Sequence, residues 1–334
     1  MKKFLSLVFG LVLVMSLFTA CSSNGGKAKT GLAVVTSTSH SSKDAGEEEG
    51  LAQTDSTVAA VIVDSKGVIK NVKFDVLQTK TKFNVAGELT TDPATTFESK
   101  QMLGDAYDMK KASPIGKEWF EQADALAEYV TGKTLEDVKG IALDGGYPTD
   151  ADLTSSVTMN ISAMISALEK AVNNAQDLGA SADDKLGLGL VGKLHKSTKS
   201  ASAEGDGDAT AYNHYAAVTF NKDGKITSSI IDASQATINF SVEGKITTDL
   251  ANATFESKLE LGDKYGMKNA SPIGKEWFEQ SKALSDYISG KTVAEVTGIA
   301  VDGGYPTDAD LTSSVTMSIS DMQTAVERAG ATAK

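Results

Sequence analysis

The sequence predicts an α+β fold made of two tandem copies of one domain, each an antiparallel sheet with helices packed on it. Three observations predict it. The chain repeats itself over most of its length, runs typical of strands precede runs typical of helices in each copy, and 334 residues with 41% hydrophobic content are enough for two ordinary cores. An α+β domain follows from that order, because alternating strands and helices would instead indicate a doubly wound sheet.

The internal repeat sets the domain boundaries. Residues 96–159 and 254–317 are related by a constant offset of 158 and are identical at 48 of 64 positions. Within them the stretch DGGYPTDADLTSSVTM occurs twice without a difference, at 144–159 and 302–317. We therefore predict one domain over 31–178 and a second over 186–334, joined near 178–185.

Each copy begins with strands and continues with helices. In the first copy, β-branched and alternating runs predict strands at 32–38, 58–63, 68–76 and 82–89, separated by turn signals. The antiparallel sheet is the simplest product of such short, turn-linked strands.

Three helices are expected after these strands. The first has Ser113 as its cap, Pro114 as its first residue and Gly132 as its stop, and a short one over 134–139 ends at Gly140. The last helix starts at or near Val157. The apolar faces of the two longer helices are formed by Ile115, Trp119, Ala123, Leu126 and Val130, and by Val157, Ile161, Met164, Leu168 and Val172.

The N-terminus has the build of a secretory signal rather than of a membrane anchor helix. Two lysines precede an apolar run that is short for a membrane span, and small residues follow it. Cys21, the only cysteine, resembles the lipidated residue of a bacterial lipobox, although Phe18 stands where leucine is usual. We expect a signal peptide over 1–20, a lipidated Cys21 and flexible tether over 21–30, and a protein held on the extracellular face of the cell membrane.

Charge and cysteine content exclude several classes of function. A net charge of −12 disfavours nucleic acid as a partner, because phosphates would be repelled by most of the surface. A single cysteine allows no internal disulfide, haem attachment pair or zinc cluster.

The repeated stretch carries the candidate site. Its Gly- and Pro-rich part is expected to lead into the N-terminus of the last helix, where free backbone N–H groups suit an anion such as a phosphate. The segment DLTSSVT at 152–158 resembles the D-x-x-S-G-A-T motif of the FMN-binding domain family, in which a flavin transferase esterifies the FMN phosphate to the final threonine. The resemblance implies two covalent FMN groups, and its motif residues here are Asp152, Ser155, Ser156 and the acceptor Thr158, with Asp310, Ser313, Ser314 and the acceptor Thr316 in the second copy.

This sequence departs from the family motif at two positions in each copy. Serine replaces the glycine, and Val157 and Val315 replace the alanine. The alternative is that Asp152, Thr154 and Ser155 are only loop and capping residues of a packed helix, because Asp, Ser and Thr are the usual residues there.

Further residues near the motif are candidates for cofactor contacts. Tyr147 and Tyr305 are candidates for contacts with the flavin ring. The double glycines either let the backbone approach the cofactor or make a turn. Met159 and Met317 either cover the flavin ring or pack in the core. We favour core packing of Trp119 and Trp277 over the alternative that they stack against the flavin ring. We expect His40 and His195 to be surface residues rather than metal ligands. The double glycines are Gly145, Gly146, Gly303 and Gly304.

The whole chain is similar to tandem-domain flavin lipoproteins of Gram-positive extracellular electron transfer. That resemblance implies an electron carrier with a membrane quinone-linked donor and an extracellular acceptor such as ferric iron. The protein would be an enzyme only if reduction of the acceptor is counted as an enzymatic activity. A cofactor-free solute-binding or adhesive lipoprotein is the alternative. A serine hydrolase is disfavoured, because the chain contains no G-x-S-x-G.

Overall fold

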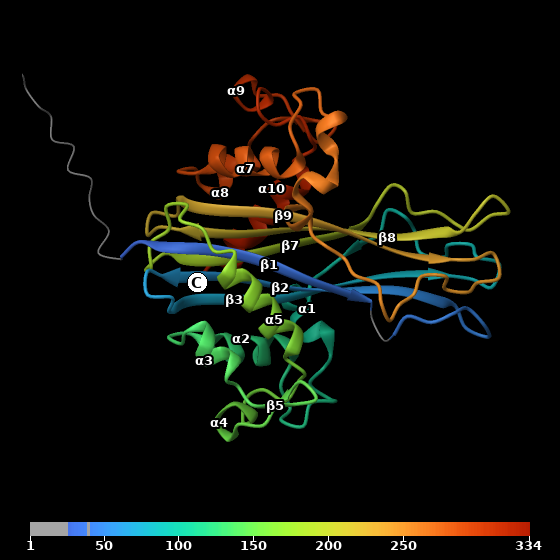
Figure 1. Ribbon diagram of the computed structural model, residues 1–334, viewed down its shortest axis with the longest axis horizontal. Helices are drawn as coiled ribbons and strands as arrows, with labels where there is room; N and C mark the ends of the chain where they lie inside the picture. Colours follow the sequence, from blue (N-terminus) through green and yellow to red (C-terminus); the bar gives the residue numbers. More distant parts are fainter. Residues whose placement is uncertain (1–25, 39–40) are drawn as a thin grey trace, which may run out of the picture.

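Two antiparallel sheets lie face to face, with helices on each outer side, in the computed structural model, which describes residues 26–38 and 41–334. Figure 1 shows this arrangement. The predicted combination of antiparallel sheets with packed helices is confirmed. The predicted signal peptide, Cys21 and His40 lie outside the described residues.

Each half contributes a three-stranded meander, in the order in which its strands occur along the chain. The 82–89 run does not form a separate strand: its beginning extends the third strand, and Phe83 then bridges back to Leu89. The strands are β1 (Ala28–Thr38), β2 (Gly50–Asp64) and β3 (Ile69–Phe83) in the first sheet, and β7 (Lys185–Leu194), β8 (Gly207–Phe220) and β9 (Ile226–Phe240) in the second.

Short helices and hairpins follow the sheet in each half. In the first half these are α1 (Lys100–Leu103), η1 (Gly104–Tyr107), α2 (Trp119–Val130), α3 (Leu135–Lys139), β5 (Leu143–Asp144), β6 (Tyr147–Pro148), α4 (Ala151–Thr154) and α5 (Ser162–Asn173). In the second half they are α6 (Lys258–Leu261), η2 (Gly262–Tyr265), η3 (Met267–Asn269), α7 (Trp277–Ile288), α8 (Val293–Thr297), β10 (Val301–Asp302), β11 (Tyr305–Pro306), α9 (Ala309–Thr312) and α10 (Ser320–Thr332). In Figure 1, α2, α3 and α4 of the first half lie below the sheets, α7, α8 and α9 of the second half lie above them, and α5 crosses in front of the first sheet.

Two of the predicted helix starts are wrong. The first long helix begins at Trp119, because a capping box between Glu118 and Glu121 fixes its N-terminus there. The last helix begins at Ser162: the backbone N–H of Ile161 donates to the carbonyl of Gly146 and not to Val157, so the helix does not extend back to the motif. The short helix predicted over 134–139 ends at Lys139 as expected and begins at Leu135, with Thr134 as its N-cap.

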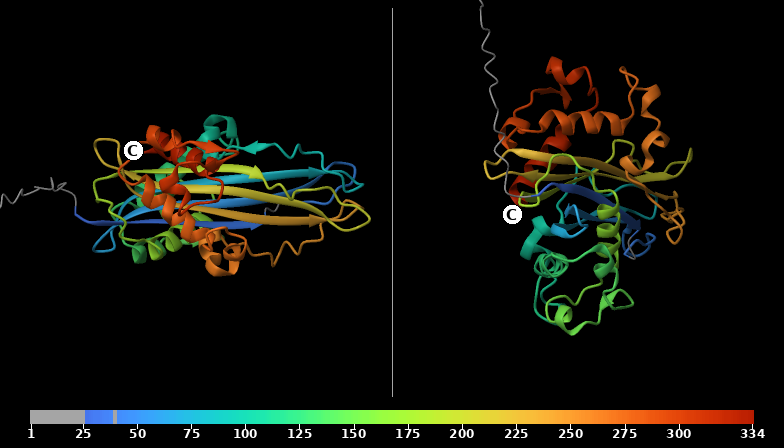
Figure 2. Two further views of the ribbon diagram at one scale, coloured as in Figure 1. Left: turned by 90° about the horizontal axis from the view of Figure 1, so that it is seen from above. Right: turned by 60° about the vertical axis from the view of Figure 1, so that its left-hand side comes forward.

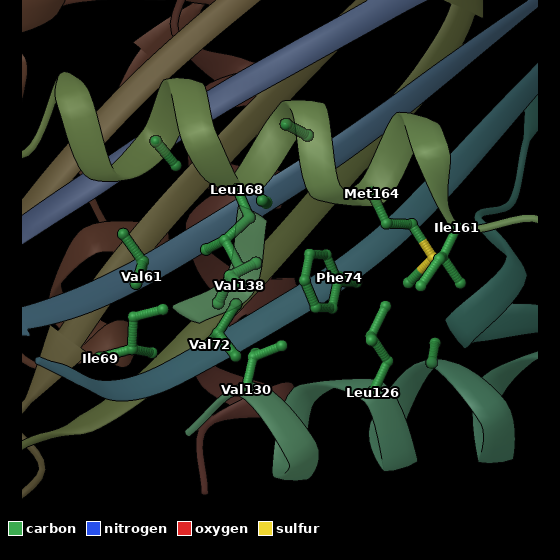
Figure 3. Close-up of a cluster of buried hydrophobic side chains, with 14 of the residues drawn as sticks. Val61, Ile69, Val72, Phe74, Leu126, Val130, Val138, Ile161, Met164 and Leu168 are labelled. Carbon is green, nitrogen blue, oxygen red and sulfur yellow. The ribbon is translucent and has the colours of Figure 1, made fainter. Parts of the chain in front are cut away.

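Three apolar layers and a smaller cluster around Phe83 and Phe240 hold the described elements together. In the first half, Phe74 of β3, Leu126 of α2 and Leu168 of α5 meet between the sheet and its helices, as Figure 3 shows. An equivalent layer lies between the second sheet and its helices. A third layer lies between the sheets, where Ile62 of β2 and Leu188 of β7 are buried in one cluster.

Segments from each half also reach the other half. The short strand β4 (Thr96–Phe97) pairs with the edge strand β7, and Thr36 of β1 forms a bridge with Phe255. At the far ends of the sheets Phe83 and Phe240 stack with their ring centroids 4.3 Å apart. The views in Figure 2 show the two long sheets overlapping along their length. The halves are therefore joined by exchanged segments as well as by the packing of their sheets.

Candidate functional site

A glycine turn supports the segment that contains each predicted acceptor threonine. Gly145 and Gly146 join β5 to β6 with φ of 55° and 91°, values that favour glycine. The carbonyl of Gly146 accepts the N–H of Ile161, and a Cβ on Gly146 would lie 2.3 Å from Oγ of Ser162. The positive φ of the turn therefore explains both glycines, and close approach of a second chain segment is a further reason for Gly146; Gly303 and Gly304 repeat this arrangement.

The serine and aspartate residues of the motif bond mainly to their own turn. The hydroxyls of Ser155 and Ser156 donate to the carbonyls of Asp152 and Leu153, and Asp150, not Asp152, accepts as the N-cap of α4. Asp310, Ser313 and Ser314 repeat this arrangement in the second half. These side chains thus shape the turn that precedes the threonine.

Thr158 and Thr316 are partly buried in the connection between two helices, before the last helix of each half begins. The backbone N–H of Thr158 donates to Oε1 of Gln122 over 2.8 Å, and its Oγ1 lies 3.4 Å from the same oxygen. Gln122 is buried and donates through Nε2 to Oγ of Ser113 over 3.0 Å. The threonine is therefore held by a glutamine of α2, and the expectation that it sits at the N-terminus of the last helix is wrong.

The second half has the same contacts at the same distances. Gln280 of α7 accepts the N–H of Thr316 over 2.8 Å, with Oγ1 at 3.4 Å, and donates to Ser271 over 3.0 Å. Both sites thus position a threonine hydroxyl through a buried amide.

A cavity of about 930 Å³ opens beside Thr316. Its volume lies in the usual range for small-molecule sites. Tyr305, Met317 and Trp277 line it, as do basic and aromatic residues to which the sequence assigned no role. Among the other lining residues are Pro93 of the first half and Lys193, His195, Lys196, Tyr212, Lys258, Tyr265, Met267 and Gln280.

Lys258 lies among aromatic rings at this cavity. The residue is 2% exposed. Its Nζ lies 4.5 Å from the ring centroids of Tyr212 and Tyr265 and 5.3 Å from that of Trp277. Nζ also donates a hydrogen bond to the Tyr212 hydroxyl over 2.9 Å. Burial lowers the pKa of Lys258 to about 7. No carboxylate of the described residues lies within ion-pair distance of it, although the buried Asp232 favours its charged form, so an anionic ligand would stabilise that form further.

Several expectations about these side chains are refined. Trp277 packs in the core as predicted and also faces the cavity, whereas Tyr305 is 55% exposed and Met317 half-buried. His195 is half-buried and lines the cavity, with its ring centroid 5.3 Å from that of Tyr212, so it is not simply a surface residue.

The first half has the corresponding lysine in a smaller space. Lys100 lies over the rings of Tyr107 and Trp119 at 4.5 and 5.3 Å, and burial lowers its pKa to about 8. A cavity of about 560 Å³ adjoins Lys100 and Tyr107, but its lining does not include Thr158. Tyr147 is 52% exposed, and Met159 packs at the edge of the first core.

The residues around Thr316 fit FMN. A planar ring could lie among Tyr212, Tyr265 and Trp277, Lys258 supplies positive charge, and the Thr316 hydroxyl is available for the phosphate. When bound, FMN would supply reversible uptake of electrons. Within the part of the chain that the structure describes, no group of three or more His, Cys, Asp or Glu residues is placed to hold a metal ion.

Sequence reasoning missed Gln122, Gln280, Lys100 and Lys258. The only signal for them was their presence at equivalent places in both repeats, in the shared segments EWFEQ and TFESK. That signal does not separate a site residue from a packing residue.

Comparison with known proteins gives one short match. A stretch of 42 residues is 55% identical to a chlorophenol reductase of Desulfitobacterium hafniense, which is 13% of this chain and 13% of that protein. The chain thus spans about 13% of the length of the curated relative it matches. Neither a family model nor a solved structure matches the chain. Over residues 26–38 and 41–334, every helix is too short or too polar to cross a membrane.

Proposed function

We propose that the protein is a membrane-tethered flavoprotein electron carrier on the extracellular face of the cell, with FMN attached covalently to Thr158 and Thr316. In this proposal the two halves are tandem FMN-binding domains. A flavin transferase joins the FMN phosphate of a flavin dinucleotide to each threonine: the hydroxyl loses its proton to a base, its oxygen attacks that phosphorus, and the phosphoanhydride bond breaks to release a nucleoside monophosphate. Covalent attachment would keep a cofactor that an extracellular protein could otherwise lose to the medium.

The cavity beside Thr316 is the observation that carries the proposal. It combines a positioned threonine hydroxyl, three aromatic rings and a buried lysine without a carboxylate partner. A planar ring with an attached phosphate uses each of these features, whereas a cofactor-free adhesive surface needs none of them.

The remaining parts of the proposal come from the sequence. Cys21 would anchor the chain in the lipid bilayer, a quinone-linked membrane protein would donate electrons, and ferric iron or a similar acceptor would receive them. The relative with the short match is named a reductase, and reductases transfer electrons. The proposal therefore describes an electron carrier, with any reductase activity arising at an exposed flavin.

Intact mass tests the proposal directly. The chain is co-expressed with a flavin transferase, denatured and weighed, together with Thr158→Ala, Thr316→Ala and the double variant. We expect the wild type to carry two FMN increments, each single variant one, and the double variant none. If the wild type carries no increment while the transferase modifies a known substrate, a cofactor-free binding lipoprotein replaces this proposal.

A further inference from the structure

We propose that the two sites have unequal charge, so that a flavin at Thr316 has a more positive reduction potential than a flavin at Thr158. This inference rests on the proposed function. It concerns the residues that differ between two otherwise matched sites.

The two sites share the residues closest to the threonine. Each has a buried glutamine, a lysine held over a tyrosine and a tryptophan, and a methionine after the acceptor. The distances agree as well: Lys100 and Lys258 each lie 4.5 Å from one tyrosine and 5.3 Å from the tryptophan. A difference between the sites must therefore come from the strands and loops around this common part.

One cross-strand pair differs in charge. Tyr212 of β8 pairs with Lys193 of β7, and the same register position in the first sheet holds Asp55 of β2 opposite Ser37 of β1. Asp55 also lies opposite Gln78 of β3, and Tyr212 lies opposite Gln235 of β9. Asp55 and Tyr212 are therefore equivalent positions in the two sheets. The first half thus has a carboxylate where the second half has a neutral phenol.

Asp55 acts on the lysine of the first site. Its negative charge favours the charged form of Lys100 and so opposes the effect of burial on the pKa of that lysine. In the second half the closest polar partner of Lys258 is the uncharged Tyr212 hydroxyl, 2.9 Å away. The equivalent buried residues Asp75 and Asp232 favour the charged forms of Lys100 and Lys258 in the two halves, so Asp55 is a carboxylate that acts on the first lysine and has no counterpart at the second.

The outer parts of the sites differ in the same direction. The cavity that adjoins Lys100, whose lining does not include Thr158, is also lined by Lys80 and Glu98, and Asp55 lies near it. The cavity of the second half is lined by three lysines and has no carboxylate among its described lining residues; Asp321, behind it, pairs with one of the three. The three lysines are Lys193, Lys196 and Lys258.

Positive surroundings favour the reduced form of a bound flavin. Reduction adds electrons to the ring, and protons from solvent only partly offset the added negative charge. Nearby positive charge in a partly buried site stabilises that form more than the oxidised one and raises the potential. The site at Thr316 has the greater excess of positive charge, so its potential should be the higher of the two.

The single-acceptor proteins allow each site to be measured alone. Thr158→Ala leaves one flavin at Thr316, and Thr316→Ala leaves one at Thr158. In a redox titration followed by flavin absorbance, we expect the Thr316 flavin to favour the reduced state at least tenfold more, a difference of about 30 mV for a two-electron couple.

Charge variants then test the cause. Tyr212→Asp should lower the potential of the Thr316 flavin. Lys196→Gln should lower it too, and this change is on an exposed residue, so it leaves the core intact. Asp55→Asn should raise that of the Thr158 flavin. Lys264→Gln, on an exposed lysine outside the cavity lining, is the matched control and should change neither.

The possible failures are distinguishable. Equal potentials in two flavinylated proteins, or potentials unaffected by Lys196→Gln and Asp55→Asn, overturn this inference and leave the proposed function standing. If neither single-acceptor protein carries an FMN increment by mass, the proposed function falls and this inference falls with it.

Discussion

The side-chain oxygen of Gln280 accepts the backbone N–H of Thr316 over 2.8 Å and lies 3.4 Å from its hydroxyl oxygen. Gln280 is itself fixed by donation to Ser271 and to the carbonyl of Lys275. A side chain that is fully buried and fully bonded in this way determines where the threonine hydroxyl points.

We expect Gln280→Leu to misplace Thr316 and to lower stability. Loss of the acceptor leaves a partly buried N–H without its partner, which costs about 1–3 kcal/mol. Chemical denaturation measures this cost, and intact mass after co-expression with the transferase should show less FMN on Thr316 and unchanged FMN on Thr158.

Gln122→Leu is the mirror control for this prediction. Its loss of FMN should fall on Thr158 alone, because the contacts of Gln122 repeat those of Gln280 in the other half. If either variant reduces incorporation equally at both threonines, the glutamines stabilise the fold and do not position the acceptors.

Lys258→Met should weaken ligand binding without weakening the fold. A buried lysine whose pKa falls to about 7 is costly to keep charged, and methionine keeps the contacts with the three rings. We expect the free energy of unfolding to stay the same or rise. In a Thr316→Ala background, fluorescence titration with free FMN should show binding at this site weakened about tenfold, because a charged hydrogen bond contributes about 1.5–3 kcal/mol.

Lys264→Met provides the comparison for that experiment. Lys264 is exposed and does not line the cavity, so its substitution removes a surface lysine without changing the site. Equal weakening by both variants would assign the effect to overall charge and contradict a specific role for Lys258.

Local signals in the sequence were sufficient for part of this fold. The short helix α3 was predicted to end at Gly140, and in the structure Thr134 caps its start; the glycine pair at 145–146 indicated a turn or a close approach to the cofactor, and it forms a turn. The Ser113–Pro114 pair also looks like a helix start, but Ser113 instead bonds to Gln122, and the capping box at Glu118 determines where the helix begins.

Long-range packing was beyond local signals. The run at 58–63 is apolar on both faces of β2: Val61 packs under the helices, whereas Ile62 packs against the second sheet. Such a run indicates a strand that is buried on both sides. The run does not show that the other sheet is what packs against the second face of β2. Nor does the sequence show that Lys258 contacts the ring of Tyr212, since both contacts join segments that are distant in the chain.

His214 should make the protein less stable in acid. It is buried on β8, its Nδ1 has no hydrogen-bond partner among the described residues, and burial lowers its pKa to about 3. The groups that face it from neighbouring elements are Asp321 of α10, which opposes this shift, Lys193 of β7, Lys258 of α6 and Tyr212 of β8.

The unfolded chain therefore binds a proton on this histidine at a higher pH than the folded chain does. Stability from His214 is complete above pH 6.5 and is lost as the pH falls from 6.5 towards 3, by about 1.4 kcal/mol per pH unit. We expect denaturation curves at pH 7, 6, 5 and 4 to show a shallower loss for His214→Leu than for the wild type. Parallel losses in the two proteins would mean that this histidine does not titrate as proposed.

Asp232 should act in the opposite direction to His214. Its buried carboxyl accepts the N–H groups of Ala233 and Leu259, and burial raises its pKa to about 6. The folded chain therefore keeps a proton that the unfolded chain has released, and stability is lost as the pH rises from about 4 to 6. Asn keeps the acceptor oxygen without the charge, so Asp232→Asn should match the wild type at pH 4 and exceed it at pH 7 by roughly 2 kcal/mol.

Asp75→Asn is the independent repeat of this experiment in the first half. Asp75 accepts the N–H groups of Val76 and Gln101, and burial raises its pKa to about 6 as well. The two substitutions lie in different sheets and share no partner, so their effects at pH 7 should add. Chemical denaturation of both single variants and the double variant at pH 4 and pH 7 measures this. A variant that is less stable than the wild type at pH 7 would show that the ionised carboxylate is preferred there, because its hydrogen bonds to backbone N–H groups then outweigh the cost of burying its charge.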